Sequence, residues 1–324
     1  MGGDFAPEEP VKGAVLAVAE DPALKVKLFG KEETVKAELA KYSYGATQIE
    51  VIPCTQVIET SEAPVDAVRK KKDSSMIKAL YAVKKKEADA FVSCGNTGAL
   101  LVGGQVIVGR LKGVERPALA FIMPTLKGPA LLIDCGASTD AKAKWLVQFA
   151  QMGSIYMKNI VGIANPRVGI INIGEEDEKG NSLVKETIPL LRQCESINFT
   201  GSVESRGITE GQADVVVCDA FTGNVVLKMY EGVAAALLKE IKGALVADAK
   251  SKAGALLIKK SLKKTLRKFS IEEYGGAPFL GIKAPVLKTH GSSKAAEIKN
   301  TVLQCRMFVE KDVPGKIEAQ FRDK

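Results

Sequence analysis

A single histidine, His290, occurs among the 324 residues, and the six cysteines are scattered with no Cys-x-x-Cys pair. Zinc sites use clustered His and Cys ligands, so we expect no dedicated metal site. No apolar run approaches the roughly 18 residues that span a bilayer. The best candidate, residues 98–109, is short and contains Gln105. The first residues, MGGDFAPEE, have neither the basic start nor the apolar stretch of a signal peptide. We therefore expect a cytoplasmic protein with reduced thiols.

The composition is that of an ordinary globular protein. Hydrophobic residues make up 46% of the chain and charged residues 26%, which excludes disorder. The formal charge of +8 is concentrated in one segment, because eight basic residues and no acid lie between Lys250 and Lys268. Without those eight, 38 Lys and Arg balance 38 Asp and Glu. A local basic segment argues against a protein that coats nucleic acid, so we expect no nucleic-acid partner.

Short β-rich runs alternate with longer helical stretches along the whole chain. This alternation predicts an α/β fold built on a parallel sheet, with strands at 26–30, 49–53, 90–93, 118–124, 130–134, 168–173 and 214–219. Helices are expected at 62–87 and 139–157. Gly128 and Pro129 favour a turn that would pair 118–124 with 130–134 as an antiparallel hairpin. No linker or internal repeat divides the chain, so we treat residues 1–324 as one unit.

Four of these strands run into loops of one chemical type. The loops CGNTGAL, CGASTD, GEEDEKGNS and AFTGNVV combine glycines with small amide or hydroxyl side chains, and each leads toward a helix. Such loops expose backbone N–H groups to an anion. A glycine at a strand–helix turn is usually structural, but four similar loops predict a polar, anion-binding crevice at the carboxyl ends of the strands. Neither a G-x-G-x-x-G nor a P-loop fingerprint follows a strand, so a standard nucleotide site is not supported.

Four side chains near glycine-rich segments are candidate ligands, and each also has a plainer interpretation. Lys179, in GEEDEKGNS, is either a solvated loop lysine or a cation over a phosphate. Arg206, in VESRGIT, has the same two interpretations. Asn224 either caps a helix or donates to a carbonyl oxygen. His290, in KTHGSS, is either a surface residue or part of another phosphate-binding turn.

Three cysteines, Cys94, Cys135 and Cys218, lie at or beside the ends of predicted strands, where a nucleophile could sit. Only one histidine is available to activate any of them. We therefore interpret them as buried structural thiols rather than as nucleophiles.

Residues 222–270 are expected to form a projecting helical hairpin. Apolar residues recur at spacings of three and four from Val226 to Ala244, which predicts a long helix with one apolar stripe. A second helix is expected at about 255–269, and the two would turn near Ser251 to Gly254.

Three adjacent apolar residues, Leu256, Leu257 and Ile258, lie near that turn among the eight basic residues. Large apolar side chains within a basic segment favour contact with an anionic membrane surface. Packing of the apolar stripe on a partner subunit and docking of an acidic protein on the lysines are the alternatives.

In order along the chain, eight motifs resemble those of the PlsX-type acyl-ACP:phosphate acyltransferases, where ACP is acyl carrier protein. They are MGGDFAP, SEAPVDAVRKKKDSSM, SCGNTGAL, LLIDCGAS, INIGEEDEKGNS, ESRGITEGQADVVVCDAFTGNVVLK, EYGGAPFLGI and THGSS, and they cover essentially the whole chain. The resemblance implies transfer of a long-chain fatty acyl group from acyl-ACP to inorganic phosphate, which gives acyl-phosphate for phospholipid synthesis. It also implies a three-layer, Rossmann-like fold similar to isocitrate and isopropylmalate dehydrogenases and to phosphotransacetylases.

The same resemblance implies a cytoplasmic homodimer that attaches peripherally to the membrane. Its partners would be acyl carrier protein, inorganic phosphate, the anionic membrane surface and a downstream glycerol-phosphate acyltransferase. No cofactor or metal would be required.

With this resemblance, the candidate residues receive roles. The candidate catalytic residues are Lys179, Asn224, His290 and Arg206, and phosphate would be bound by Asn96, Thr97, Gly98, Gly174 and Ser292. Phosphate is already an oxyanion and a thiolate leaves readily, so the site must mainly orient the reactants and stabilise the tetrahedral oxyanion. Glycine loops with Asn, Lys and Arg suit that task.

Two other functions are weighed against this one. A decarboxylating dehydrogenase could share the fold, but it would need a divalent metal held by clustered Asp residues, and the sequence has no convincing set. A non-enzymatic membrane scaffold would use the basic hairpin and leave the crevice vestigial.

Overall fold

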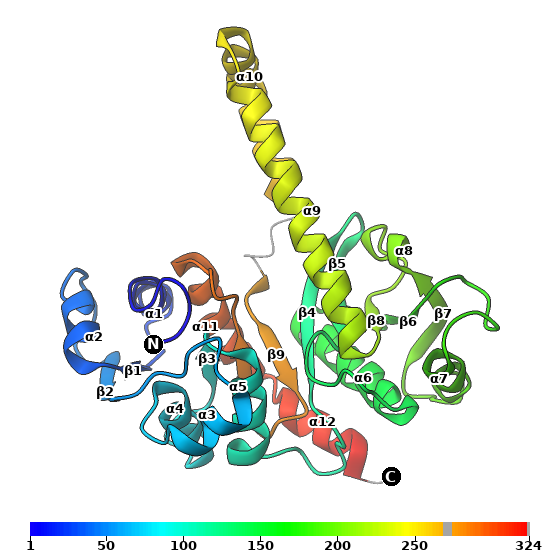
Figure 1. Ribbon diagram of the computed structural model, residues 1–324, viewed down its shortest axis with the longest axis horizontal. Coiled ribbons are helices and arrows are strands. Elements are labelled where there is room, and N and C mark those ends of the chain that lie inside the picture. Colours follow the sequence, from blue (N-terminus) through cyan, green and yellow to red (C-terminus); the bar gives the residue numbers. More distant parts are fainter. Residues whose placement is uncertain (268–273, 323–324) are drawn as a thin grey trace.

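The computed structural model describes residues 1–267 and 274–322, and in it α-helices surround a mixed β-sheet (Figure 1). Eight strands form the main sheet in the order β3-β10-β9-β4-β5-β8-β6-β7, and β1 and β2 form a separate parallel pair. The strands are β1 (Val26–Gly30), β2 (Ile49–Pro53), β3 (Phe91–Ser93), β4 (Ala118–Thr125), β5 (Gly128–Ile133), β6 (Arg167–Asn172), β7 (Asn198–Glu204), β8 (Val215–Val217), β9 (Ala277–Leu280) and β10 (Val286–Lys288).

The seven strands expected from the sequence are all present, and β4 and β5 pair as the expected antiparallel hairpin. Three strands were not expected: β7, β9 and β10. β7 has the sequence NFTGSVE, in which polar residues and a glycine mask the apolar alternation. β9 and β10 have only four and three residues, too few for a periodic pattern.

The four glycine-rich loops do not all follow strands of one direction, so the prediction of a purely parallel sheet is wrong. Three successive antiparallel pairings, β10 with β9, β9 with β4 and β4 with β5, reverse the strand direction. β3 and β10 therefore run opposite to β5, β8 and β6. Strand direction follows from pairing order, which local sequence does not reveal.

Helices cover both faces of the main sheet. They are α1 (Glu8–Glu20), α2 (Glu32–Leu39), α3 (Pro64–Lys70), α4 (Ser75–Lys84), α5 (Thr97–Gly103) with the π-helix η1 (Gly104–Val108), α6 (Ala143–Tyr156) with the π-helix η2 (Met157–Val161), α7 (Ser182–Arg192), α8 (Ser205–Thr209), α9 (Ala220–Val246), α10 (Ala249–Arg267), α11 (Ala295–Glu310) and α12 (Val313–Arg322). The single helix expected at 62–87 is two helices, α3 and α4. Ser74 interrupts it, because its hydroxyl accepts a hydrogen bond from the Ile77 N–H and caps α4.

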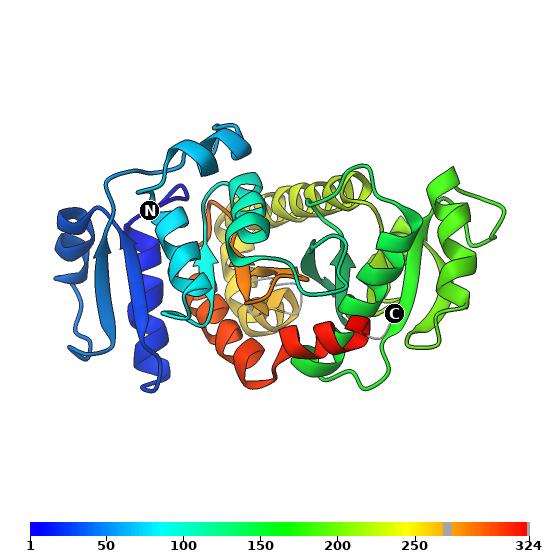
Figure 2. The same cartoon turned by 90° about the horizontal axis from the view of Figure 1, so that it is seen from below.

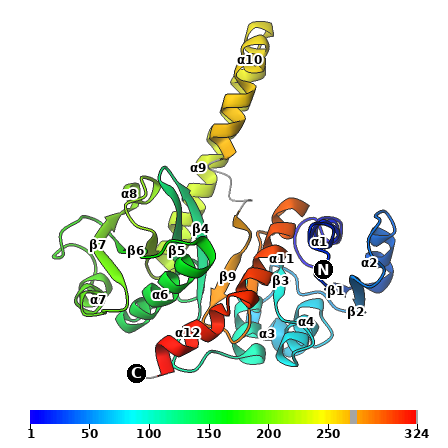
Figure 3. The ribbon, with the colours of Figure 1, turned by 180° about the vertical axis from the view of Figure 1, so that it is seen from behind.

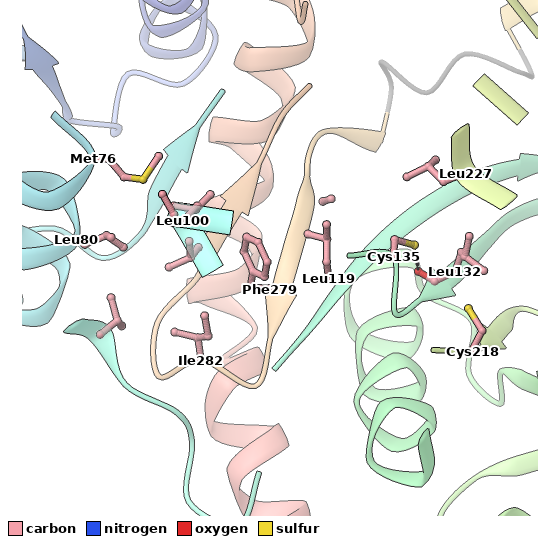
Figure 4. Packing of buried hydrophobic residues seen from close by; sticks show 14 of the residues in the cluster. Met76, Leu80, Leu100, Leu119, Leu132, Cys135, Cys218, Leu227, Phe279 and Ile282 are labelled. Atoms are coloured by element: carbon pink, nitrogen blue, oxygen red, sulfur yellow. Dashed lines mark hydrogen bonds between the residues drawn. The ribbon is translucent and has the colours of Figure 1, made fainter. Parts of the chain in front are cut away.

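The main sheet separates two apolar cores, one on each of its faces. In β5, Leu132 packs on the side of α4, α5 and α9, whereas Leu131 and Ile133 pack on the side of α6, α7 and α12. Val216 and its neighbours in β8 alternate in the same way, as expected for central strands buried on both faces. Figure 4 shows the first core passing from Met76 and Leu100 through Phe279 to Leu132.

The two ends of the molecule are joined from behind by the carboxyl-terminal helices. In Figure 3, α11 and α12 run across the back of the sheet, from the side of α1 and β3 to the side of α6. Seen from below, the pair β1–β2 lies at one end of the molecule and β7 with α7 at the other (Figure 2).

Helices α9 and α10 form a hairpin that projects from the body (Figure 1). The predicted turn at Ser251 to Gly254 is wrong, since both residues lie inside α10. The turn falls at Ala247 and Asp248, where the Asp248 carboxylate accepts a hydrogen bond of 2.7 Å from the Ser251 N–H. An acidic cap, rather than the glycine, starts the second helix. Residues 268–270 of the predicted hairpin lie outside the described residues.

Replacement of Gly223 by alanine should destabilise the protein. A Cβ there would lie 1.9 Å from the carbonyl oxygen of Asp134, so α9 or the strand end must shift, and we expect a loss of at least about 2 kcal/mol in the free energy of unfolding. Gly232→Ala, in the same helix with nothing within 4 Å, is the matched control and should stabilise by up to about 1 kcal/mol. Urea unfolding measures both, and equal effects would contradict the close contact.

Candidate functional site

A cavity of about 510 Å³ lies where the centre of the sheet meets the start of α9. Its apolar floor includes Leu119, Phe121 and Leu227, and Figure 4 places Leu119 and Leu227 at the edge of the apolar core. Its polar lining combines residues from both strand directions: Thr97, Gly98, Gly136, Asn224, Lys228, Glu231, Lys288, His290, Ser292 and Glu297. A cavity with an apolar floor and convergent polar groups is the usual form of a small-molecule site.

Lys288, the last residue of β10, is the cavity residue that sequence reasoning missed. Its ammonium donates to the carbonyl oxygens of Cys94 and Thr289, which carry no formal charge. Burial lowers the pKa of Lys288 below the usual lysine value. None of the ion pairs within the described residues uses this ammonium. It is a largely buried cation at the wall of a cavity, which a bound anion would stabilise. The sequence signal for this residue was its place in KTHGSS, two residues before His290.

The turn after β3 supplies Thr97 and Gly98 to the cavity. Asn96, predicted to bind phosphate with them, forms hydrogen bonds to other groups of the protein. Its side chain caps α5 by accepting from the Ala99 N–H, and its amide donates to the carbonyls of Glu59, Thr60 and Glu62. Asn96 therefore fixes the position of the turn, and its polar atoms are occupied by the protein.

His290 and Ser292 meet at the cavity wall. The Nδ1 atom of His290 lies 2.6 Å from the Ser292 hydroxyl and accepts from the Ser292 backbone N–H at 3.2 Å. A backbone N–H can only donate, so the neutral imidazole carries its proton on Nε2. The Nε2 atom, which takes no part in these two contacts, thus presents an N–H donor.

Asn224 lies in the first turns of α9 and lines the same cavity as Lys288. Its side-chain amide donates to the carbonyl oxygen of Cys135 at 3.3 Å. It is not the helix cap, because Asp219 caps α9 by accepting from the N–H and hydroxyl of Thr222. The interpretation of Asn224 as the helix cap is therefore wrong, and its donation to the carbonyl of a substrate stays a prediction.

The loop that carries Cys135 and Gly136 is held by the buried carboxylate of Asp134. One oxygen accepts from the N–H groups of Leu119, Gly136 and Ala137, and the other accepts from Ser138. Burial nevertheless raises the pKa of Asp134 to about 6, since it disfavours the charged form more than these four bonds favour it. The carboxylate shapes the loop and does not line the cavity.

The remaining predicted residues, Lys179, Gly174 and Arg206, do not line this cavity. Lys179 is exposed and pairs with Glu176 at 2.8 Å, and Gly174 lies against its side chain. The same glutamate raises the pKa of Lys179. Arg206 is exposed and pairs with Glu204 at 2.5 Å. These residues follow β6 and β7, at the far side of the sheet from β3 and β10.

Burial raises the pKa of each of the Cys94, Cys135 and Cys218 thiols. Thiols of this kind are poor nucleophiles, because the reactive form is the thiolate. Among the residues that the structure describes, no three His, Cys, Asp or Glu side chains gather in a way that would hold a metal ion. None of the described helices has both the length and the apolar character needed to cross a bilayer.

The structure defines the class as an α/β protein with a mixed sheet and a cavity that joins an apolar floor to a largely buried cation. Solved structures agree with this fold. Phosphotransacetylases from Staphylococcus aureus and Streptococcus pyogenes superpose with TM-scores of 0.60 and 0.61, each over 94% of this chain and 91% and 92% of their own, at 16% identity. A 4-hydroxythreonine-4-phosphate dehydrogenase from Klebsiella pneumoniae superposes with a TM-score of 0.52 over 95% of this chain and 97% of its own, at 15% identity.

Sequence comparison is more specific. The model of the family described as "Fatty acid synthesis protein" matches residues 1–316. A phosphate acyltransferase of Clostridium botulinum is 48% identical over 100% of this chain and 98% of its own length, and one of Clostridium perfringens is 46% identical over 100% and 96%. The chain belongs to the PlsX family of phosphate acyltransferases, enzymes of fatty acid and phospholipid synthesis.

The raised pKa of Asp134 predicts a pH dependence. A carboxyl with a higher pKa in the folded state contributes most to stability below pH 4, and the contribution, about 3 kcal/mol, is lost as the pH rises through 6. The carbon-13 signal of the side-chain carboxyl, assigned by its loss in Asp134→Asn, should titrate with a midpoint near 6. A midpoint at or below the ordinary Asp value would contradict the dominance of burial.

Proposed function

We propose that the protein transfers a long-chain fatty acyl group from acyl-acyl carrier protein to inorganic phosphate, releasing acyl-phosphate. The observation that carries this proposal is the cavity in which the Lys288 ammonium and the apolar residues Leu119, Phe121 and Leu227 line one space. The cation suits the phosphate, and the apolar floor suits the carbon chain next to the thioester. An acyl donor and an anion that react with each other would require the apolar floor and the cation at the same time.

Phosphate is assigned to the Lys288 side of the cavity. The ammonium donates to two carbonyls and has a third N–H for a phosphate oxygen. Thr97, His290 and Ser292 line the same cavity and are the further proposed donors to the phosphate. Charge-assisted bonds from such a group hold the nucleophile in place, which is the main requirement of the reaction.

The chemistry is then a direct displacement. A phosphate oxygen forms a bond to the thioester carbonyl carbon, the carbonyl becomes a tetrahedral oxyanion, and the carbon–sulfur bond breaks as the thiolate leaves. Asn224, which lines the same cavity, is the proposed donor to that oxyanion through its side-chain amide. No acyl-enzyme is formed, because the raised pKa values of Cys94, Cys135 and Cys218 keep these thiols protonated.

The proposed homodimer uses the apolar face of α9. Several large apolar side chains of this helix are exposed: Val225, Met229, Val233, Leu237 and Ile241. A contiguous apolar face of this kind marks an interaction site in a soluble chain. The start of the helix carries Asn224, so a partner packed on the same helix would lie close to the mouth of the cavity.

The proposed membrane contact uses α10. Leu256 and Leu257 are 74% and 87% exposed and lie within the helix, past its first turn. They are surrounded by the basic residues of the same helix, each worth about 1 kcal/mol near an anionic surface. The product would be a membrane-soluble acyl-phosphate, so release at the membrane would bring it to a downstream glycerol-phosphate acyltransferase. The protein would then be a peripherally attached cytoplasmic enzyme.

The test of function is the loss of acyl-ACP thioester with and without inorganic phosphate. Cleavage should require phosphate and yield acyl-phosphate. Lys288→Met should raise the phosphate KM and lower the rate at subsaturating phosphate by about ten- to a hundredfold, the loss of a charge-assisted contact worth roughly 1.5–3 kcal/mol.

Lys179→Met is the matched control that tests which lysine binds phosphate. Each substitution removes one positive charge, but of these two lysines only Lys288 lines the cavity. If Lys179→Met gives the larger loss, phosphate binds at the loop after β6 instead. Equally fast thioester loss without phosphate would refute the reaction itself.

The membrane contact is tested by Leu256→Glu with Leu257→Glu, which spares every lysine. The double variant should no longer sediment with vesicles of anionic lipid, since burial of a leucine is worth about 1.5–3 kcal/mol, and it should keep the turnover of soluble acyl-ACP. The control is Val233→Glu on the exposed face of α9, which should change dimer mass rather than sedimentation. Sedimentation like that of the wild type would refute the membrane contact, and a monomeric double variant would assign these leucines to the dimer.

A further inference from the structure

Among the described residues that line the cavity beside α9, two are lysines. Lys228 of α9 accompanies Lys288 of β10 there, and the proposed function uses only Lys288. The two ammonium groups act on each other, because the charge of Lys228 adds to the larger effect of burial in lowering the pKa of Lys288. Two neighbouring cations that repel each other are both stabilised by one anion that contacts both.

Lys228 belongs to a polar row on the cavity face of α9. Asn224, Lys228 and Glu231 follow one another at spacings of four and three residues, which places them on one face of the helix. All three line the cavity. Val225 and Met229, which come directly after Asn224 and Lys228, are exposed instead. The helix therefore turns its polar row toward the cavity and its apolar residues away from it.

In this structure the Lys228 ammonium already has an anionic partner. It donates to a carboxylate oxygen of Glu231 at 2.7 Å. The side chain of Lys228 is 51% exposed and that of Glu231 is 27% exposed, so water screens their attraction. Ion pairs of this kind contribute little to stability. The pair can therefore open for an anion that binds the lysine more strongly.

The balance of charge in the cavity shows what such an opening would provide. Its described lining includes two carboxylates, Glu231 beside Lys228 and Glu297, which acts to raise the pKa of Lys288. With His290 neutral, two lysines and two glutamates leave this lining without a formal net charge. An incoming phosphate therefore gains a second cation only if a carboxylate releases its lysine.

We propose that Lys228 is a second phosphate-binding lysine of this cavity, and that Glu231 holds its ammonium in the free protein in place of phosphate. The proposal deepens the proposed function, because it rests on the assignment of phosphate to the Lys288 side of the cavity. As phosphate enters, the Lys228 ammonium turns from Glu231 to a phosphate oxygen. Lys288 keeps its two carbonyl partners and donates its third N–H to the same anion.

The two glutamate and lysine side chains of α9 thus have different roles. Lys228 contacts the phosphate, and two charge-assisted contacts orient the attacking oxygen better than one. Glu231 is a positioning residue, which holds the Lys228 ammonium near the cavity until phosphate replaces the carboxylate. It competes with phosphate for the same N–H donors, so the removal of its charge should strengthen phosphate binding.

The test measures phosphate binding without an acyl donor, from the broadening of the phosphorus-31 signal of inorganic phosphate as the full chain is added. Lys228→Met should weaken binding by about tenfold or more, the loss of one charge-assisted contact. Lys228→Arg, which keeps the charge and the donors, should restore most of the affinity. Lys239→Met is the matched control, because Lys239 is exposed on α9 and does not line the cavity. It should bind phosphate like the wild type.

Glu231→Gln separates competition from support of the site. It should strengthen phosphate binding by about two- to fivefold, the range of an exposed ion pair, and lower the phosphate KM in turnover. The strengthening should vanish in the Lys228→Met background, since the two residues act through one contact.

Wild-type phosphate binding by Lys228→Met would overturn the proposal, and so would an equal loss in Lys239→Met. Weaker binding by Glu231→Gln would overturn it as well, because the carboxylate would then support the site instead of occupying the lysine. The reaction is tested separately. If the variants change phosphate binding as expected while the wild type cleaves the acyl-ACP thioester equally fast without phosphate, the binding site stands and the proposed reaction is refuted.

Discussion

The close contact between the first turn of α9 and the end of β5 sets the geometry on which most of this protein depends. Gly223 lies so near the Asp134 carbonyl that no side chain fits, and the Asp134 carboxylate holds the following loop through four backbone N–H groups. That loop supplies Cys135 and Gly136 to the cavity, and the helix supplies Asn224. The same helix continues into the projecting hairpin (Figure 1). The cavity and the base of the hairpin are thus positioned by one backbone contact.

A second constraint is electrostatic. The hydrogen bonds of the Lys288 ammonium go to two carbonyl oxygens, and burial lowers its pKa more than the nearby Glu297 raises it. A cation in this state has more to gain from an incoming anion than an exposed lysine such as Lys179, which is already paired with Glu176. In the proposed reaction this lysine would favour phosphate binding, and the remaining requirements would be orientation and oxyanion stabilisation.

Sequence reasoning located most of the strands and the glycine-rich loops, because apolar runs bounded by turn residues are local signals. It also identified Thr97, Gly98, Asn224, His290 and Ser292, which the structure brings to one cavity. It failed for Lys288, since one lysine in KTHGSS resembles many solvated lysines until its burial is known. It also misplaced the hairpin turn, because Gly254 was a stronger local signal than the cap at Asp248.

The sequence by itself determined the family, the α/β class, the apolar stripe of α9 and the basic character of α10, because these depend on motif order, periodicity and composition. The tertiary structure alone decided which loops meet. Three antiparallel pairings in the middle of the sheet turn β3 and β10 against β5 and β8. The loop with Lys179 follows β6, which lies far from β3 in the sheet, whereas the loop after β5 reaches the cavity that Thr97 lines. Pairing order is a property of contacts between distant segments, and burial of a charge depends on all of them together. Neither is encoded in any short stretch of residues.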